Sequence, residues 1–235
     1  MAGETVRSEA VCLAIVPWSR TSHIVSWLTP VGKVASVVKG AVRPKSFFLG
    51  QYDLNYTCDI LYYARGKGDL HALREAFALN RRDFLRNDYL ALALAGYFRA
   101  LAFAVAPAGD DAREFFRLLT VALDSLERPD YLRQLLSFEI GLLDLMGIGP
   151  EVGEGKDGEI VLRGERKMPI SAGVAAMIAS IRRGENCPAD ENNLDFLLDL
   201  SRVIGVYYAL HVGLSPEARR SILSMITNKS KVKAK

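Results

Sequence analysis

The sequence predicts an α+β protein of two domains, with a five-stranded β-barrel at the N-terminus and an α-helical domain after it. Up to about residue 80, short apolar runs rich in β-branched and aromatic residues alternate with turns that contain Gly or Pro. From residue 83 onwards, apolar residues recur at helical spacing. The chain has 235 residues, 50% of them hydrophobic, which suffices for a sizeable core. We expect a barrel domain over residues 1–80 and a helical domain over residues 81–235.

Five strands are expected in the barrel domain, over residues 9–16, 23–29, 33–39, 51–63 and 69–79. The first is a continuous apolar run that is too short for an ordinary helix. The third carries a lysine at each end, and Gly40 ends it. The fifth has residues that favour a helix, but it follows a glycine turn directly after a strand, and this favours a hairpin.

Five short strands joined by glycine turns are typical of a small closed barrel. The oligonucleotide-binding (OB) fold is the best-known five-stranded case, and we predict it here. A small SH3-like barrel is the alternative that the strand pattern leaves open. A turn is expected at residues 17–21, between the first two strands.

Six helices are expected after the barrel, over residues 84–106, 112–126, 129–146, 171–182, 191–211 and 215–227. Pro129 and Pro216 favour helix starts because proline fits the first helical turn. Residues 147–166 are rich in glycine and charge, with a strand-like piece at 159–162, which predicts a loop or a small hairpin. The last eight residues contain four lysines and are expected to be frayed.

Charge is unevenly distributed along the chain. The first 82 residues contain eleven Lys and Arg against six Asp and Glu, whereas the remainder contains nineteen against twenty-one. This asymmetry indicates that the front part meets nucleic acid or an anionic membrane. The apolar stretch 89–108 could span a membrane by length, but Arg99 lies in its middle, where a charge costs roughly 2.5–3.5 kcal/mol. We therefore expect a helix buried in a bundle and no membrane partner.

The N-terminus has Glu4 and Glu9 where a signal peptide needs an apolar core, and the three cysteines are isolated from one another. Both features predict a cytoplasmic protein. His71 and Glu75 stand four residues apart without further ligands, so they do not predict a metal site. Gly-x-Ser-x-Gly is absent, and Asp157 follows Gly-Lys where a phosphate-binding loop needs Ser or Thr. We predict a protein that is not an enzyme and needs no cofactor or metal.

Basic residues cluster at predicted turns and strand ends of the barrel, namely Lys33, Lys39, Arg43, Lys45, Arg65 and Lys67. Aromatic residues are interleaved with them, namely Trp27, Phe47, Phe48, Tyr52, Tyr62 and Tyr63. Lys and Arg neutralise phosphates and release counterions, and flat side chains stack on unpaired bases. We predict that this face binds nucleic acid, while part of the aromatic set fills the core.

Several segments resemble the N-terminal domain of the RecO family, the recombination mediators of bacterial DNA repair. The likeness is carried by Ser22, Ile24 and Val25, by Thr29, Gly32 and Lys33, by Lys39, Gly40, Arg43, Lys45 and Ser46, and by Gly66, Gly68, Asp69, Leu70, Leu73 and Glu75. Further on, Phe138-Glu139, Leu142-Leu143, Gly147 and Pro150 resemble the helix that leads to the family's variable middle module.

Two departures from the family pattern stand out. Trp18-Ser19-Arg20 replaces the frequent Tyr-Gly-Glu, which reverses one charge. Many members carry a four-cysteine zinc module after the Gly-x-x-Pro, but residues 151–166 have no cysteine. The resemblance therefore implies a shortened, cysteine-free middle module near residues 148–170, and no metal.

The resemblance implies a non-enzymatic mediator that binds single- and double-stranded DNA, anneals strands and acts at the nucleoid. Its implied partners are a RecR-like protein and the acidic C-terminal tail of a single-strand-binding protein, with recombinase loading as the outcome. The tail would need an apolar pocket with cations nearby, and the candidates are Arg99, Arg117, Arg133, Arg219 and Arg220. The residues alone leave two alternatives, a protein-interaction adaptor and an RNA-binding barrel protein.

Overall fold

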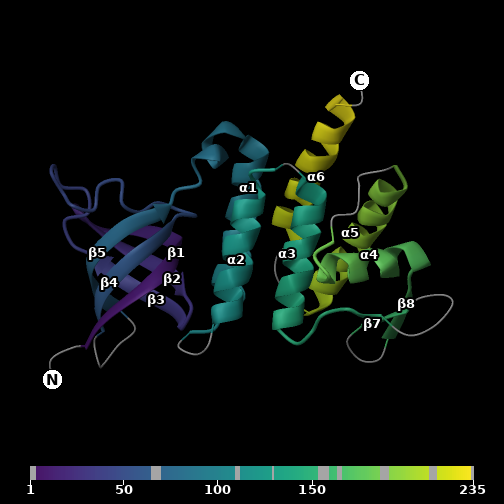
Figure 1. Ribbon diagram of the computed structural model, residues 1–235, viewed down its shortest axis with the longest axis horizontal. Helices are drawn as coiled ribbons and strands as arrows, with labels where there is room; N and C mark the ends of the chain where they lie inside the picture. The colour runs from purple at the N-terminus through teal and green to yellow at the C-terminus, as the bar shows by residue number, and fades with distance from the viewer. Residues whose placement is uncertain are drawn as a thin grey trace. The chain divides into compact units, whose positions relative to one another are not determined.

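The computed structural model describes residues 4–64, 70–108, 112–128, 130–152, 159–162, 166–185, 191–211 and 216–233 (Figure 1). The chain divides into two compact units, Met1–Glu127 and Arg128–Lys235. The first unit contains the barrel together with two helices, so the division falls well after residue 80, where the sequence analysis expected it. The reason is that these helices cover apolar residues on the outside of the barrel, as described below.

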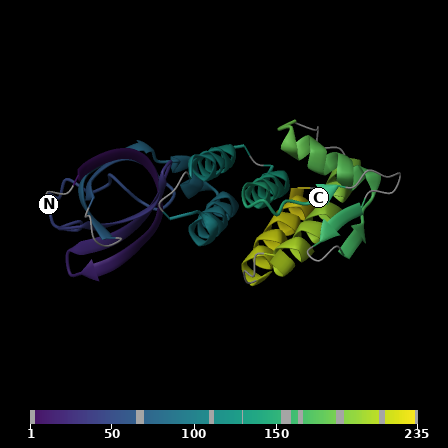
Figure 2. The same ribbon diagram turned by 90° about the horizontal axis from the view of Figure 1, so that it is seen from below.

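The first unit begins with five strands that close into a barrel (Figure 2). The strands are β1 (Glu4–Ser19), β2 (Ser22–Thr29), β3 (Gly32–Val38), β4 (Thr57–Ala64) and β5 (Leu70–Asn80). Their order around the barrel is β1-β2-β3-β5-β4, in which β4 pairs with β1 and β3 runs parallel to β5. This arrangement confirms the predicted α+β class with an OB-like N-terminal barrel.

Strand β1 is 16 residues long and pairs with two neighbouring strands. Residues 4–11 pair with β4, and residues 11–19 pair with β2. The register shifts between Cys12 and Ala14, and a bulge of this kind bends a strand and increases its twist. The bend lets one strand reach both neighbours. Strand β1 also continues to Ser19, so most of the turn expected at 17–21 is strand instead.

The barrel interior is filled by alternate residues of the strands. Trp27 is fully buried, and its indole Nε1 donates a hydrogen bond to Ser36 Oγ at 2.8 Å. Cys12, Cys58 and Ile60 are fully buried in the same cluster. Because successive residues of a strand point to opposite faces, this inward set determines which residues face outwards.

Two helices lie against one side of the barrel, α1 (Tyr89–Val105) and α2 (Arg113–Ser125), preceded by the 3₁₀ helix η1 (Asp83–Asn87). Val11, Leu13 and Leu28 have no exposed surface although they are outside the interior cluster. Helices α1 and α2 contact β1 and β2 and bury this outer apolar area. In the part of the chain that the structure describes, no helix combines the length and apolarity needed to cross a membrane.

The second unit contains the helices α3 (Tyr131–Leu145), α4 (Ala172–Arg182), α5 (Glu191–His211) and α6 (Pro216–Lys233). Between α3 and α4 lies a small sheet of β6 (Glu151–Val152), β7 (Glu159–Leu162) and β8 (Arg166–Pro169), with β7 in the centre. The strand predicted at 159–162 is confirmed. Helix α6 runs to Lys233, so the expectation of a frayed tail from residue 228 is wrong as far as residue 233.

A buried ion pair ties α6 to α3 in this unit. Arg219 donates from Nε and Nη2 to the two carboxylate oxygens of Glu139, at 2.8 and 2.9 Å. The side chain of Arg219 is 9% exposed and that of Glu139 is 0% exposed. A Cβ added at Gly205 on α5 would lie 2.8 Å from Arg219 Nη1, so this glycine leaves room for the guanidinium.

Candidate nucleic-acid interface

Two loops of the first unit meet at one end of strands β2 and β3. The turn between β1 and β2 comprises residues 20–21, and the connection between β3 and β4 comprises residues 39–56. The amide of Val42 donates to the carbonyl of Thr21 at 3.4 Å, and His23 is the strand partner of Val38. Because paired strands lie about 5 Å apart, the beginning of the long loop runs beside the turn.

Four basic side chains are exposed on these two loops, and we call them the loop cations: Arg20, Lys39, Arg43 and Lys45. Among the described residues, none of the four takes part in an ion pair. Their charges are therefore not neutralised by neighbouring carboxylates. An array of unpaired cations attracts a polyanion such as a sugar–phosphate chain.

The backbone of the long loop is shaped to display these cations. Gly40 has φ +69°, in the left-handed region that glycine tolerates, and a Cβ there would lie 3.3 Å from Cδ of Arg43. The aliphatic stem of Arg43 can therefore pass close to the backbone. Lys45 also has a positive φ, 65°, which disfavours a lysine by about 1–2 kcal/mol. Strained residues of this kind cluster at functional sites.

Lys33 lies elsewhere, at the opposite end of β3 from Lys39. Six residues of strand separate the two, which corresponds to about 20 Å. The Lys33 ammonium donates to the carbonyl of Phe103 at 2.9 Å and lies 5.6 Å from the centre of its ring. Its main-chain amide donates to the carbonyl of Pro107 at 3.0 Å. Lys33 therefore fastens β3 to the end of α1, away from the loop cations.

Of the six basic residues predicted to form the site, the structure brings together Lys39, Arg43 and Lys45. Arg65 and Lys67 lie outside the described residues. Arg20 joins the group although the sequence analysis did not propose it. Its signal was present in the sequence, as the charge reversal at the Tyr-Gly-Glu position of the family pattern.

The aromatic residues divide between the core and the surface. Trp27 and Tyr62 belong to the interior cluster, and Phe48 and Tyr52 pack against it. Phe47, in contrast, is 95% exposed in the long loop. Trp18 was not among the aromatic residues named in the sequence analysis. It precedes the β1–β2 turn and is 63% exposed. Two flat side chains are thus available beside the loop cations.

An uncharged row crosses the outer face of the barrel next to these loops. Val16 pairs with Ile24, Ile24 with Val37, Val37 with Ala72, and Ala72 with Tyr63. None of the five belongs to the interior cluster, so they face outwards. The guanidinium of Arg74 covers the ring of Tyr63, 4.9 Å from its centre. Such a surface presents uncharged side chains, against which the neutral bases of a nucleic acid can pack.

The barrel offers no activated nucleophile among its described residues. Burial raises the pKa of the Cys58 thiol to about 12, and burial also raises the pKa of Cys12, with Cys58 as a further cause. Both thiols are therefore neutral at physiological pH and unreactive. Over the described ranges, no three His, Cys, Asp or Glu side chains gather in a way that could hold a metal ion.

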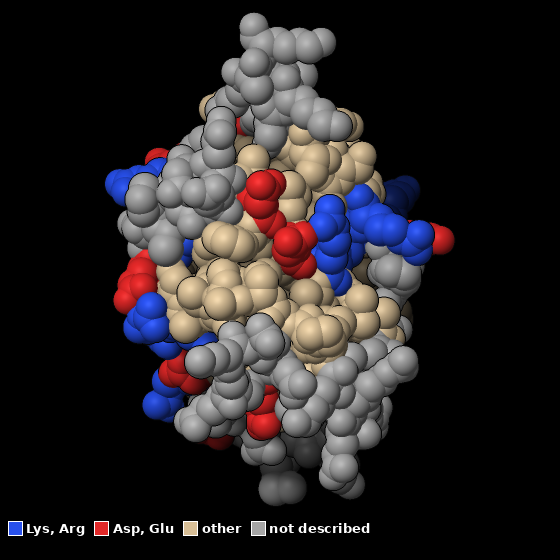
Figure 3. Space-filling view, turned by 90° about the vertical axis from the view of Figure 1, so that its right-hand side faces the viewer, with Lys and Arg blue, Asp and Glu red and all other residues tan. Residues whose placement is uncertain are grey.

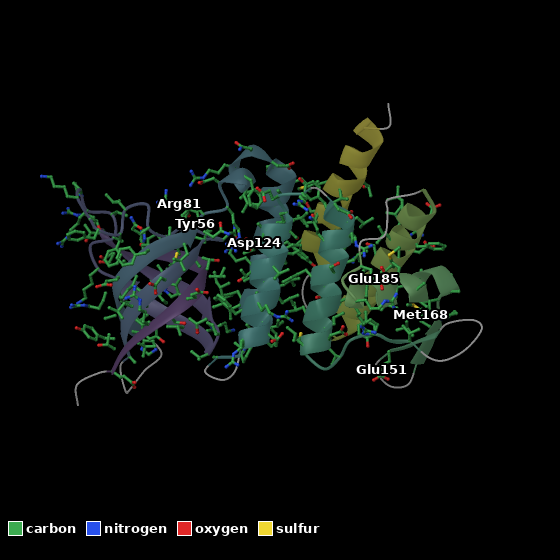
Figure 4. All side chains as sticks on the ribbon, in the orientation of Figure 1. Tyr56, Arg81, Asp124, Glu151, Met168 and Glu185 are labelled. Carbon is green, nitrogen blue, oxygen red and sulfur yellow. The ribbon has the colours of Figure 1, made fainter. Side chains whose placement is uncertain are left out.

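A groove of about 560 Å³ lies where the end of β5 meets η1 and α2. Figure 4 labels two of its lining residues, Arg81 and Asp124. Arg82 also lines the groove but is largely buried, and it donates to Asp124 at 2.7 Å and to the carbonyl of Asn55 at 2.6 Å. Because the lining also includes Asp83 and Glu127, the groove has mixed charge and is not suited to a polyanion.

The five arginines proposed as rims of a partner-tail pocket all have partners within the chain. The partners are the Leu13 carbonyl for Arg99, Glu114 for Arg117, the Glu185 carbonyl for Arg133 and Glu139 for Arg219. The second unit also interleaves its charges, since Figure 3 shows acidic and basic side chains side by side on one of its faces. The loop cations of the barrel differ from these arginines in having no ion-pair partner in the part of the chain that the structure describes.

Comparisons with known proteins point to one family. A family model described as Recombination protein O C terminal matches residues 86–155. The chain is 29% identical over 192 residues to the DNA repair protein RecO of Rhodopirellula baltica, covering 79% of this chain and 68% of the relative. It is 30% identical over 146 residues to that of Geobacter metallireducens, covering 61% and 59%.

A third relative extends the likeness over almost the whole chain. The DNA repair protein RecO of Prosthecochloris aestuarii is 24% identical over 264 aligned positions, which cover 94% of this chain and 97% of the relative. The match to the Geobacter protein spans less than two thirds of that relative's length. These matches agree with the motifs in the first eighty residues, and together they support a relationship between this chain and the RecO family of DNA repair proteins.

Proposed function

We propose that this protein is a non-enzymatic DNA-binding mediator of recombinational repair, which holds DNA on the barrel through Arg20, Lys39, Arg43 and Lys45. The observation that carries the proposal is that these four cations are exposed and unpaired on two hydrogen-bonded loops. The names of the relatives support a role in DNA repair. Phosphate contacts give affinity without reading sequence, as a mediator that acts anywhere on a chromosome requires.

Strand annealing follows from the same chemistry. Two complementary strands repel each other through their phosphates, and cations on a protein surface reduce that repulsion. A surface that grips the backbone leaves the bases free to pair. In this proposal a RecR-like protein and the acidic tail of a single-strand-binding protein act as partners, and the result is access of a recombinase to the DNA.

The test measures binding of a labelled single strand by fluorescence anisotropy at several salt concentrations. The variant Lys39→Gln/Arg43→Gln/Lys45→Gln is expected to bind weakly, with a slope of log affinity against log salt that is flatter by roughly 0.7 per lost contact, about 2 in total. An unchanged affinity and slope would contradict the proposal and favour a protein-interaction adaptor.

A matched control removes the same charge elsewhere on the surface. The variant Arg117→Gln/Arg183→Gln/Arg202→Gln breaks three exposed ion pairs, each between residues two or three positions apart. Such pairs contribute little to stability, so the fold should persist. Its salt slope is expected to match that of the wild type. Equal losses in both triple variants would mean that net charge, rather than the loop cations, controls binding.

A second assay tests the mediator role itself. Annealing of complementary strands coated with single-strand-binding protein is expected to be accelerated by the wild type and not by the loop-cation variant. Competition between DNA and RNA of the same sequence separates the proposed function from that of an RNA-binding barrel. Stronger competition by RNA would overturn the DNA assignment.

A further inference from the structure

Two aromatic side chains at the loop cations have no role in the core. Trp18 is 63% exposed and Phe47 is 95% exposed. Most other aromatic residues of the barrel are engaged inside it or at its rim, whereas Phe77 on β5 is 49% exposed and pairs with Asp59 in the sheet. Trp27 is buried and bonded to Ser36, and Tyr62 stacks on His71 with their ring centres 5.2 Å apart. Exposed rings next to cations are suited to a nucleic acid, because flat side chains stack on unpaired bases while the cations hold the phosphates.

The loop cations cannot by themselves distinguish paired from unpaired strands, because both carry phosphates. A ring can stack only on a base whose face is free, and the bases of a duplex are stacked on one another. Stacking of one base on an aromatic side chain changes affinity by roughly 5- to 150-fold. Trp18 lies at the end of β1, two residues before Arg20, and Phe47 lies in the long loop, two residues after Lys45. A strand held by its phosphates there has its bases within reach of a ring.

We propose that Trp18 and Phe47 form an aromatic platform that makes this surface select unpaired over paired DNA. The proposal rests on the proposed function, since it requires that the loop cations hold the backbone. Tyr63 is not included in the platform, because Arg74 already covers its ring. The platform makes the barrel release a strand once it has paired, because pairing restacks the bases and removes the contacts with the two rings.

The experiment compares the affinities of a single strand and of its duplex for the wild type, Trp18→Ala, Phe47→Ala and the loop-cation triple variant. Each aromatic variant is expected to weaken single-strand binding by roughly 5-fold or more and to leave duplex binding within about twofold. Equal weakening of both, or of neither, would overturn the platform. The triple variant is expected to weaken both forms, and if it weakens neither, the proposed function fails independently of the rings.

Tryptophan emission provides a direct readout of the contact. The chain contains two tryptophans, of which Trp27 is fully buried and Trp18 is exposed. A single strand is expected to quench the emission of Trp18, whereas Trp18→Phe, which retains only the buried indole, should show no quenching. Quenching that persists in Trp18→Phe would show that the strand acts on Trp27 through a change of fold, and would overturn the assignment of Trp18. Melting curves confirm that each variant folds.

Discussion

In the proposed function, Lys45 is a single residue at which binding and stability oppose each other. Its backbone has φ 65°, which a glycine would adopt at lower cost. The proposed function accounts for a lysine there, because its charge is exposed together with those of Arg20, Lys39 and Arg43. Residues with a strained backbone conformation cluster at functional sites in natural proteins.

We predict that Lys45→Gly separates the two effects. The free energy of unfolding should stay the same or rise by up to about 1 kcal/mol, because the strain is relieved. Affinity for a single strand should fall, because one phosphate contact is lost. Urea denaturation and anisotropy measure the two quantities on the same sample. A variant that is less stable and binds as well as the wild type would show that Lys45 serves the fold.

The buried thiols predict how stability responds to pH. Cys12 and Cys58 have no exposed surface, and burial raises the pKa of both, that of Cys58 to about 12. The unfolded chain loses these protons near pH 9, whereas the folded chain keeps them. Stability is therefore full below pH 8 and falls as the pH rises past 9, by about 1 kcal/mol in total between pH 8.5 and 9.5.

The measurement is urea unfolding at pH 7.5, 8.5 and 9.5, followed by tryptophan emission. Both tryptophans lie in the first unit, as do both thiols. The variant Cys12→Ala/Cys58→Ala should be less stable at every pH but should lose the alkaline decline. A decline of the same size in this variant would assign it to other groups.

At the scale of elements, the pair of Glu139 with Arg219 joins two helices that are about eighty residues apart in the chain. We predict that Glu139→Ala destabilises the second unit by about 3–5 kcal/mol, because it leaves a buried guanidinium without its counter-charge. Glu139→Leu/Arg219→Met should recover most of the loss, since it replaces the pair by apolar side chains of similar volume.

The unfolding of the two units can be followed by separate spectroscopic signals. The second unit is mainly helical and has no tryptophan. The circular dichroism transition at 222 nm should therefore shift in Glu139→Ala, while the tryptophan emission transition of the first unit stays in place. Equal shifts of both signals would show that the two units unfold together.

At the scale of the whole molecule, the first unit ends at Glu127 rather than with the last barrel strand. We predict that a fragment of residues 1–127 folds alone and binds a single strand within a few-fold of the full chain. A fragment of residues 1–80 should aggregate, because it exposes Val11, Leu13 and Leu28.

The two fragments are compared by thermal melting, light scattering and anisotropy. Arg99, which donates to the Leu13 carbonyl, and Phe103, which accepts from Lys33, are present in the longer fragment alone. A cooperative, monomeric fragment of residues 1–80 would mean that the helices add nothing essential and that the boundary predicted from the sequence is the physical one.

The presence and type of the strands and helices were predicted better than their exact ends. All five barrel strands and the six α-helices of the described residues were placed from periodicity and turn residues, because a repeat of 2 or 3.6 is a local property of the chain. The short strands β6 and β8 were not predicted. The ends of the predicted elements were less accurate. Residues 51–56 were predicted as strand but precede β4, and residues 17–19 were predicted as turn but complete β1. Strand ends depend on which neighbour supplies the last hydrogen bond.

The candidate site was predicted in part, and each miss has a tertiary cause. Lys33 matched the basic pattern, but the carbonyl of Phe103, seventy residues away, accepts its hydrogen bond. Trp27 and Trp18 are equally aromatic, yet register places one in the core and leaves the other exposed. Arg20 was passed over because its place beside Lys39 depends on the pairing of β2 with β3.

By itself, the sequence determined the five-stranded barrel, the helices, the basic front part and the resemblance to the RecO family. These follow from the order of residue types, which folding does not alter. Tertiary structure alone decided which cations remain unpaired, which rings face outwards and where the first unit ends. Those outcomes depend on contacts between residues far apart in the chain. A side chain becomes buried, or a charge becomes paired, only when folding brings the two contacting residues together.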